Sequence, residues 1–500
     1  MSAFGLVLSG AAAVFSDPLT IVYFLVGVFG GIVFGAIPGL TGALGVSLML
    51  PFTFAMAPAQ GIATLIAIYV GGVSGGLIAS IMLNIPGNAA AIVTCFDGSP
   101  MARKGQPYRA LSYGATASLI GGLFSGVVMI FVATGLGRFG LLFGSWEYFA
   151  LGIMGLAVVV SLCSEDLIKG LISAVIGMIL AMVGMDKLSS LERFTFGWWR
   201  LSSGFSEMTV LMGLFALGEI LTQLGNLGRP MQRTDSSERR TVIPARGAFR
   251  GLKKTVLTSS VIGTLIGILP GVGQSTAALV AYNQAKNSSR EPEKFGTGCP
   301  EGIVAPESAN NAVCGGALIP MMTLGIPGDT ITAMLMSGLI VHGLAPGASL
   351  FDNNPEIVGT IYFSYIVACL VMYLMYILFL KYFIKILSTP MNYMFPVILL
   401  MCLIGALTNN NRIFDIWVFF VMGILGYVFQ QVGIPVAPLT LGYVLGPTVE
   451  LNFRTAIMAF HGNAFSLFTR PIAICLLAVA VVMLAWPSLK KRRSRQKTKS

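Results

Sequence analysis

The sequence reads G-I-V-F-G-A-I-P-G-L-T-G from Gly31 to Gly42 and G-T-L-I-G-I-L-P-G-V-G-Q from Gly263 to Gln274. An offset of 232 residues pairs the first stretch with the second and places Pro38-Gly39 on Pro270-Gly271. Each Pro-Gly pair predicts a break in an apolar helix, because proline removes a backbone donor and glycine makes the chain permissive. Two helix breaks at matching places in two halves of a membrane protein indicate a duplicated transport site.

The composition predicts an all-α, polytopic integral membrane protein. The chain has 500 residues, of which 55% are hydrophobic and 10% charged, and its mean hydropathy is +0.83. Soluble domains carry about 25% charged residues, so lipid is expected to cover most of this surface. The seven cysteines form no close Cys-x-x-Cys pair, and the chain has two histidines, His342 and His461. We therefore predict no metal site beyond a possible Na⁺ site.

The net charge of +11 is concentrated in two segments. Residues 226–254 hold eight of the 31 Arg and Lys residues, and residues 488–500 hold seven. The positive-inside rule places both segments in the cytoplasm, and nucleic-acid binding is the weaker explanation of the same charge. The apolar residues 1–15 contain no Lys or Arg, so we expect an interfacial helix or a part of the fold there rather than a signal peptide.

The apolar segments recur in the same order in two halves. We predict a first membrane repeat at 1–225, a basic cytoplasmic linker at 226–254, a second repeat at 255–470, and an extra transmembrane helix with a basic cytoplasmic tail at 471–500. Each half also contains a second break, N-I-P-G-N at 84–88 and G-I-P-G-D at 325–329, offset by 241 residues.

Loop charges predict that the two repeats have inverted topology. The loop at 51–60 has no Lys or Arg, whereas its counterpart at 284–303 has three. The loop at 97–109 has three, whereas its counterpart at 343–356 has none. Because the charge changes sides between the halves, we expect inverted repeats, with 19–54 and 255–283 forming helical hairpins whose tips are the Pro-Gly breaks. The unpaired span 471–486 then returns the basic tail to the cytoplasm.

Five motifs, in order along nearly the whole chain, resemble the large membrane subunit of the tripartite tricarboxylate transporters. They are P-G-L-T-G (38–42), N-I-P-G-N (84–88), P-G-V-G-Q (270–274), P-E-S-A-N-N-A (306–312) and G-I-P-G-D (325–329). The resemblance implies a bacterial inner-membrane importer of di- or tricarboxylates such as citrate, driven by an ion gradient. It also implies two partners, a small membrane subunit and a periplasmic substrate-binding protein.

The residues at the breaks are the candidates for substrate binding. A broken helix frees backbone N–H groups at the positive end of its second half, and these can hold a carboxylate without a buried Arg. A packing kink relieved by neighbouring helices is the alternative reading of a single break. The candidate residues are Pro38, Gly39, Leu40, Thr41, Gly42, Ser74, Asn84, Pro86, Gly87, Asn88, Pro270, Gly271, Gly273, Gln274, Ser275, Asn310, Asn311, Pro327, Gly328 and Thr330.

Two acidic residues near the breaks, Asp329 and Glu307, are the candidates for cation coupling. A carboxylate inside a membrane is expensive and is functional by default. Capping of the following helix is the alternative role of Asp329. Glu307 borders the preceding polar loop, which favours capping or solvation, and Ser74 lies among glycines that also serve close helix packing.

Energetics favour symport with Na⁺ or H⁺. Importing an anion against an inside-negative potential costs about 2.3 kcal/mol per charge per 100 mV, so a di- or trianion needs accompanying cations. The sequence contains no G-x-x-x-x-G-K-[S/T] motif, so we expect no ATP hydrolysis and no cofactor apart from the coupling ion.

A membrane-embedded hydrolase is the rival from another class. Gly72-Val73-Ser74-Gly75 matches the G-x-S-G of rhomboid-like proteases, and Gly328-Asp329 is similar to aspartyl intramembrane proteases. A serine nucleophile needs a nearby base and an aspartyl site needs a second Asp, and neither is evident. A channel is a third possibility, but hairpin tips in two inverted halves favour alternating access. We therefore predict a transporter with no catalytic residues.

Overall fold

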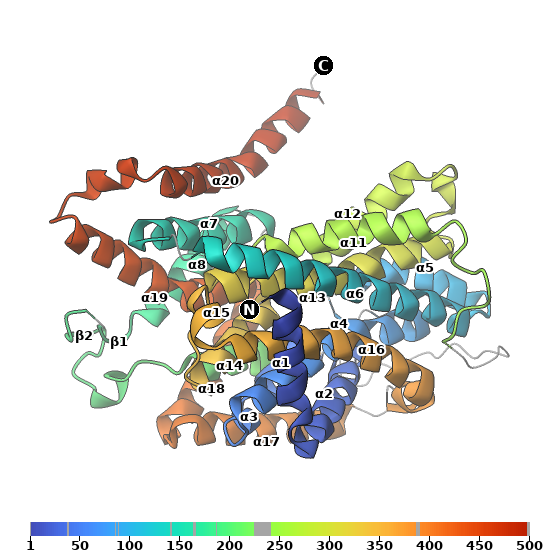
Figure 1. Cartoon of the computed structure of the whole chain (residues 1–500), viewed down its shortest axis with the longest axis horizontal. Helices are drawn as coiled ribbons and strands as arrows, with labels where there is room; N and C mark the ends of the chain where they lie inside the picture. Colours follow the sequence, from blue (N-terminus) through green and yellow to red (C-terminus); the bar gives the residue numbers. More distant parts are fainter. Residues whose placement is uncertain are drawn as a thin grey trace.

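The computed structural model describes residues 2–37, 40–85, 87–88, 90–140, 143–163, 167–186, 188–224, 242–386 and 391–497. These residues are almost entirely helical (Figure 1). The elements of the N-terminal half are α1 (Ala3–Phe15), α2 (Pro18–Ala36), α3 (Gly42–Thr53), α4 (Pro58–Leu83), α5 (Ala91–Arg103), α6 (Pro107–Gly140), α7 (Ser145–Cys163), α8 (Leu167–Ala181), β1 (Gly184–Met185), β2 (Glu192–Arg193), the 3₁₀ turn Trp199–Leu201, α9 (Glu207–Met212), the π-helical segment Gly213–Leu217 and α10 (Gly218–Leu224).

The C-terminal half repeats the order of long and broken helices. Its elements are α11 (Lys253–Ile268), α12 (Gly273–Ser288), the 3₁₀ turn Pro292–Lys294, α13 (Pro300–Leu324), α14 (Thr330–Val341), α15 (Ser349–Asn353), α16 (Pro355–Ile386), α17 (Met391–Asn410), α18 (Ile413–Val432), α19 (Val436–Ala459), the 3₁₀ turn Ala464–Thr469 and α20 (Pro471–Lys497). The predicted linker 226–254 falls largely outside the described residues, of which 242–252 form turns before α11.

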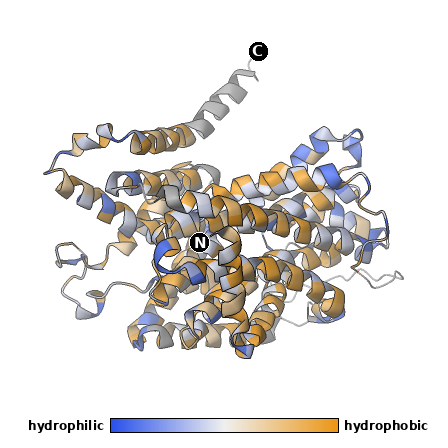
Figure 2. Ribbon diagram, in the orientation of Figure 1, coloured by the Kyte–Doolittle hydropathy of each residue, from blue (hydrophilic) through white to orange (hydrophobic). Residues whose placement is uncertain are grey.

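Apolar helices dominate the described part of the chain (Figure 2). Five of them are long and apolar enough to cross a membrane: Pro18–Ala36, Pro58–Leu83, Pro107–Gly137, Pro355–Lys385 and Ile413–Val432. Shorter apolar helices, α3 and α14 among them, lie beside the breaks. The fold is therefore that of an all-α, multi-pass membrane protein, as the composition predicted.

Two buried helices, α4 and α13, form the centre of the protein. Every residue from Gly61 to Met82 and from Gly302 to Thr323 is buried. A helix that is apolar on all sides is stable only inside a protein or a bilayer, and these two are enclosed by other helices. They also meet each other directly, since the Ser74 hydroxyl donates a hydrogen bond to Asn311 Oδ1 at 2.6 Å.

The repeated glycines make the same contact in both halves. A Cβ built on Gly35 would lie 2.0 Å from the carbonyl oxygen of Gly72, and one built on Gly267 would lie 2.6 Å from that of Val313. Gly267 corresponds to Gly35 at the offset of 232, and Val313 corresponds to Gly72 at the offset of 241. Helix α2 thus packs on α4 as α11 packs on α13, with glycine allowing the close approach of the backbones.

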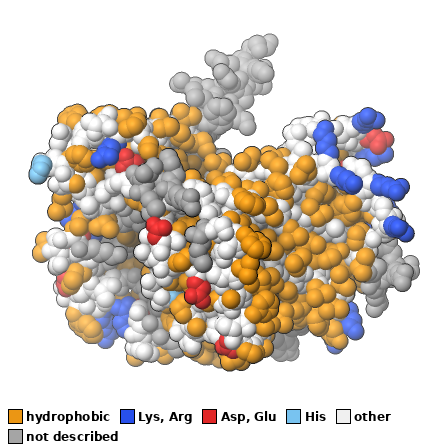
Figure 3. Space-filling model, in the orientation of Figure 1, with side chains coloured by type: hydrophobic (Ala, Val, Ile, Leu, Met, Phe, Trp, Pro, Cys, Tyr) orange, Lys and Arg blue, Asp and Glu red, His pale blue; other side chains and the backbone are white. Residues whose placement is uncertain are grey.

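The two ends of the molecule differ in their charged side chains. Lys and Arg side chains gather at the end that holds the connection between α12 and α13, and an apolar surface lies beside them (Figures 1 and 3). We call this the basic end, and Lys104, Arg250 and Lys294 line one recess there. The strands β1 and β2 lie at the opposite end (Figure 1).

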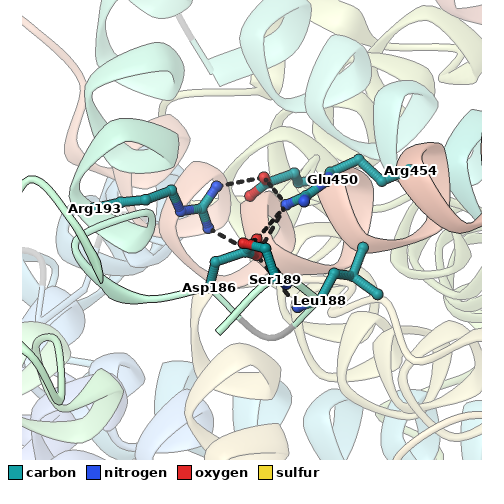
Figure 4. A network of polar contacts seen from close by, with 6 residues as sticks. All are labelled: Asp186, Leu188, Ser189, Arg193, Glu450 and Arg454. Atoms are coloured by element: carbon teal, nitrogen blue, oxygen red, sulfur yellow. Dashed lines mark hydrogen bonds and ion pairs between the residues drawn. The ribbon is translucent and has the colours of Figure 1, made fainter. Parts of the chain in front are cut away.

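An ion-pair network ties the β1–β2 hairpin to α19 at that opposite end (Figure 4). Arg454 binds Asp186 at 2.8 Å and Glu450 at 3.1 Å, and Arg193 binds Asp186 at 3.5 Å as well as Glu450. The hydrogen bond from Ser189, followed by that from Arg454, holds the pKa of the Asp186 carboxyl well below its usual range. The Asp186 carboxylate at the centre of the network therefore stays charged at neutral pH.

The structure extends one predicted segment. The C-terminal hairpin, predicted at 255–283, continues to Ser288 at the end of α12. The added residues, Gln284 to Ser288, are mostly polar, so a search for apolar runs does not detect them. The N-terminal residues belong to the fold, because Gly10 of α1 packs against the backbone of Gly359 in α16.

We predict that Gly35→Ala destabilises the protein and that Gly30→Ala does not. The methyl group at residue 35 would overlap the Gly72 carbonyl, and overpacking of this kind costs about 1–3 kcal/mol. Gly30 lies on the same helix with no atom within 4 Å of its added Cβ, so it is a matched control. Thermal unfolding in detergent measures both variants, and equal melting temperatures would show that the contact between α2 and α4 is not tight.

Candidate functional site

The described residues of the four breaks meet around one cavity of about 290 Å³. It lies where α3, α5, α12 and α14 begin, so four helix N-termini are directed to one place. The lining residues are Thr41, Gly42, Ala43, Gly72, Val73, Asn88, Phe215, Gly271, Val272, Gly273, Gln274, Ser275, Asp329, Thr330, Ile331, Ala437 and Leu441.

Side chains cap three of these four helices. Thr41 Oγ1 accepts a hydrogen bond from Leu44 N at 3.2 Å. Asn88 Oδ1 accepts one from Ala91 N at 2.9 Å, and Asp329 Oδ1 accepts one from Thr332 N at 2.7 Å. Asn88 and Asp329 are counterparts at the offset of 241, and they cap their helices through the same atom. Each cap uses an N–H group that the helix itself leaves free.

The fourth helix, α12, has no side-chain cap. Its first residue, Gly273, is the counterpart of Thr41 at the offset of 232, so a glycine replaces the capping hydroxyl. Gly273 adopts φ +73°, a conformation that favours glycine. Among the described residues, no acceptor binds the N–H groups of Gly273, Gln274 or Ser275. These donors and the positive end of a 16-residue helix face the cavity.

Asp329 is the one charged side chain among the described residues that line the cavity. It is 4% exposed, and its Oδ2 accepts hydrogen bonds from Tyr69 Oη at 2.7 Å and from Gln274 Nε2 at 2.9 Å. The two C-terminal breaks are joined by a further bond, from Gly271 N to Gly328 O at 2.7 Å. Asp329 therefore caps α14 and also connects α4, α12 and α14.

One wall of the cavity is apolar. Phe215 lies in the π-helical segment Gly213–Leu217, and Ala437 and Leu441 are one turn apart on α19. Irregular π segments often occur at functional sites. Sequence reasoning missed these three residues, because they lie far from every break in the chain and carry no local signal. The wall can accommodate the carbon skeleton of a ligand whose polar groups bind at α12.

Nine of the predicted residues line this cavity: Thr41, Gly42, Asn88, Gly271, Gly273, Gln274, Ser275, Asp329 and Thr330. Pro38, Gly39 and Pro86 lie outside the described residues. Ten others lie outside the lining: Leu40, Ser74, Asn84, Gly87, Pro270, Glu307, Asn310, Asn311, Pro327 and Gly328. Asn84 is an exposed left-handed residue at the end of α4, and Gly87 packs against the Gly35 carbonyl.

Ser74 and Asn311 belong to the contact between α4 and α13. Ser74 and Asn311 bind each other, and Asn311 Nδ2 also donates to the Glu307 carbonyl at 3.2 Å. Asn310 is 2% exposed, and its Oδ1 has no hydrogen-bond partner among the described residues.

Glu307 does not border a loop, so the expectation of capping or solvation is wrong. Helix α13 begins seven residues earlier, at Pro300, and Glu307 is 1% exposed. Its carboxylate accepts hydrogen bonds from Thr94 Oγ1 at 2.6 Å and from Ser118 Oγ at 3.0 Å. The polar sequence around residue 307 concealed a buried helix, because the side chains of Glu307 and Asn311 bind polar side chains of other helices in the interior.

The geometry does not favour a hydrolase. Ser74 Oγ is bound to Asn311. His342 lies beside Gly61, and the 13 residues from Gly61 to Ser74 place the two side chains about 20 Å apart along α4. His461 is exposed after α19. Asp329 has no second carboxylate among the described cavity residues.

Comparison with known proteins gives the family. The sequence model of the tripartite tricarboxylate transporter TctA family matches residues 21–441. The chain is 34% identical to an uncharacterized 52.8 kDa protein in the TAR-I ttuC' 3'region of Agrobacterium vitis, over 96% of this chain and 95% of that protein. It is 37% identical to an uncharacterized protein in the TAR-II ttuC' 3'region of the same organism, over 46% of this chain and 97% of that protein.

No solved structure matches the chain significantly. The family match covers most of the sequence, including all four breaks, and the helices are those of a multi-pass membrane protein. The TctA family is a family of transporters and not of enzymes, and its members are the large subunit of the tripartite system. This chain belongs to the tripartite tricarboxylate transporter TctA family.

Proposed function

We propose that this chain carries a di- or tricarboxylate such as citrate across a bacterial inner membrane by symport with Na⁺ or H⁺. In this proposal it works with a small membrane subunit and a periplasmic substrate-binding protein, as the family implies. The observation that carries the proposal is the uncapped N-terminus of α12 in the cavity where the four breaks meet.

The free N–H groups of α12 suit a carboxylate. Three consecutive N–H groups and the positive end of the helix can bind an anion with no basic side chain. None of the described residues that line the cavity is Lys or Arg. A substrate carboxylate at Gly273–Ser275 would provide the cap that Thr41 provides for α3 in the other half. Ser275 is exposed and also offers its hydroxyl group.

The negative charge of Asp329 in the cavity is the reason to expect coupling to a cation. A di- or trianion bound at α12 would be repelled by this carboxylate unless a cation or proton lay between them. Three donors fix the position of the Asp329 carboxylate, and Oδ2 lies beside Gln274 at the start of α12. Binding of substrate and cation would thus depend on each other. Glu307, the other acidic residue predicted from the sequence, is also buried and stays a candidate for the same coupling.

The duplicated contacts support a structural repeat, and the loop charges favour inverted topology, which would give access to alternate sides. In this proposal α2–α3 and α11–α12 are hairpins that reach the cavity from opposite faces. The positive-inside rule places the basic end, the linker 226–254 and the C-terminal tail in the cytoplasm. Helix α20 is then the extra span that returns the tail to that side.

We predict that Gln274→Pro weakens substrate binding far more than Gln274→Ala. Proline at the start of a helix removes an N–H group that no helical bond uses. The preceding Gly273, the first residue of α12, has φ +73° and so lies outside the right-handed helical region that a following proline disfavours. Loss of one hydrogen bond to a charged group costs about 1.5–3 kcal/mol, or roughly 10- to 100-fold in apparent KM.

Uptake kinetics with the co-expressed partner subunits measure this difference. The labelled substrate is the carboxylate taken up best in a screen with and without Na⁺. Gln274→Ala is the control, because it removes the side-chain bond to Asp329 but keeps the backbone N–H. Equal KM values for the two variants would show that the backbone of α12 does not bind the substrate.

We predict that Asp329→Asn abolishes gradient-driven accumulation but retains exchange of labelled for unlabelled substrate. The variant removes the charge that the coupling cation neutralises. Asn88 Oδ1 accepts a hydrogen bond from the N–H three residues later, as Asp329 Oδ1 does, so asparagine at residue 329 is expected to keep the bond to Thr332 N. A loss of accumulation would therefore result from the missing charge and not from misfolding.

Vesicles with imposed Na⁺, H⁺ and voltage gradients test this prediction. The wild-type chain with its partners should accumulate substrate only while a gradient exists, and Asp329→Asn should equilibrate substrate without accumulation. Accumulation by wild type after all gradients are collapsed would contradict symport. Undiminished accumulation by Asp329→Asn would contradict the role of Asp329.

A further inference from the structure

The seam between α5 and α12 runs from the cavity to the basic end. Asn88, just before α5, and Gly273–Ser275 of α12 line the cavity. The opposite ends of the two helices lead to Lys104 and to the connection that contains Lys294. One helix comes from each half of the chain, so the seam is also a boundary between the halves.

A small apolar cluster fills this seam. It consists of Ala90, Val93, Ala278, Tyr282, Phe295 and Cys299. The Tyr282 ring contacts Phe96 and Phe295 edge to face, with centroids 5.5 and 5.4 Å apart. The cluster packs α5 against α12 between the cavity and the basic end.

A recess of about 520 Å³ lies on the other side of the cluster. Phe295 and Cys299 belong to both the cluster and the recess wall. Lys104, Arg250 and Lys294 also line the recess, against Glu291 and Glu301. The cluster therefore separates the cavity from a partly basic space at the basic end.

The buried carboxylate of Asp97 connects the two sides of this seam to each other. It lies on α5 and is 0% exposed. Oδ1 accepts hydrogen bonds from Gly298 N at 2.7 Å and Cys299 N at 2.8 Å, and Oδ2 accepts one from Tyr282 Oη at 2.9 Å. Gly296 N lies 3.0 Å from both oxygens. All these donors belong to the C-terminal half, so Asp97 joins the halves at the basic end of the seam.

We propose that the seam between α5 and α12 is the route by which the substrate leaves towards the basic end, and that Asp97 is the latch that closes it. This inference rests on the proposed transport function. Opening needs α5 to separate from Tyr282 and from the segment 296–299. The recess borders that segment, so water from the recess can hydrate the Asp97 carboxylate once its donors move away. A buried carboxylate without such access to water would be too costly to release.

The test labels a cysteine in the cavity from each side of the membrane. Ser275→Cys places a thiol on the cavity wall, and a membrane-impermeant maleimide is added to vesicles of either orientation. Labelling of the chain without Ser275→Cys gives the contribution of the seven native cysteines. No substrate is present, so the result does not depend on whether a carboxylate is the cargo.

Asp97→Asn is combined with Ser275→Cys. The combination is expected to raise the rate of maleimide labelling at residue 275 from the basic end about fivefold, and to lower the rate from the opposite end. The amide group has the size of the carboxylate but presents hydrogens to the donors. Tyr282→Phe, which removes one of the bonds, should produce a smaller shift in the same direction. Asp352→Asn, an exposed acid after α14, is the matched control and should change neither side.

Two results would overturn the proposal. Unchanged labelling from the basic end in both Asp97→Asn and Tyr282→Phe would show that this seam is not a gate. An equal rise from both ends would show that Asp97 only holds the fold together, because a loosened structure exposes the cavity to both sides. If Asp97→Asn fails to fold, Tyr282→Phe alone decides between these outcomes.

Discussion

The structure depends on the need to satisfy backbone hydrogen bonds at helix ends inside a membrane. A broken helix leaves N–H and C=O groups that lipid cannot bind, so a break is stable only where protein or a polar cavity surrounds it. This chain gathers four breaks in one place and caps three of the four new N-termini with Thr41, Asn88 and Asp329. The fourth N-terminus, that of α12, has no protein cap. Backbone N–H groups that no described residue accepts from are thereby placed at the wall of this cavity.

The contacts that the two repeats share form the scaffold of the cavity, and the residues that differ between the repeats determine what the cavity can bind. Gly35 and Gly267 make the same close contact with α4 and α13. The caps differ, because Thr41 in one half corresponds to Gly273 in the other, and neutral Asn88 corresponds to charged Asp329. In the proposed mechanism, the first difference makes room for an anion and the second makes that anion require a cation. Two identical repeats would have neither of these differences.

Much of the site could be predicted from the sequence, because a helix break has a local signature. Proline and glycine placed the breaks near residues 38, 86, 270 and 327, and the matching offsets indicated that the breaks belong together. The apolar wall formed by Phe215, Ala437 and Leu441 could not be predicted, since helices far apart in the chain bring it to the cavity. The burial of Glu307 and the role of Asp97 were missed for a related reason. Each carboxylate is bound by partners from the other half, and no sequence spacing records such partners.

The most direct test of the central claim is an electron cryo-microscopy structure of the chain with its carboxylate substrate bound. Density for a carboxylate group is expected within hydrogen-bond distance, about 2.7–3.2 Å, of the N–H groups of Gly273–Ser275, with the carbon skeleton against Phe215 and Leu441. Density at another place, with the start of α12 occupied only by water, would contradict this binding site.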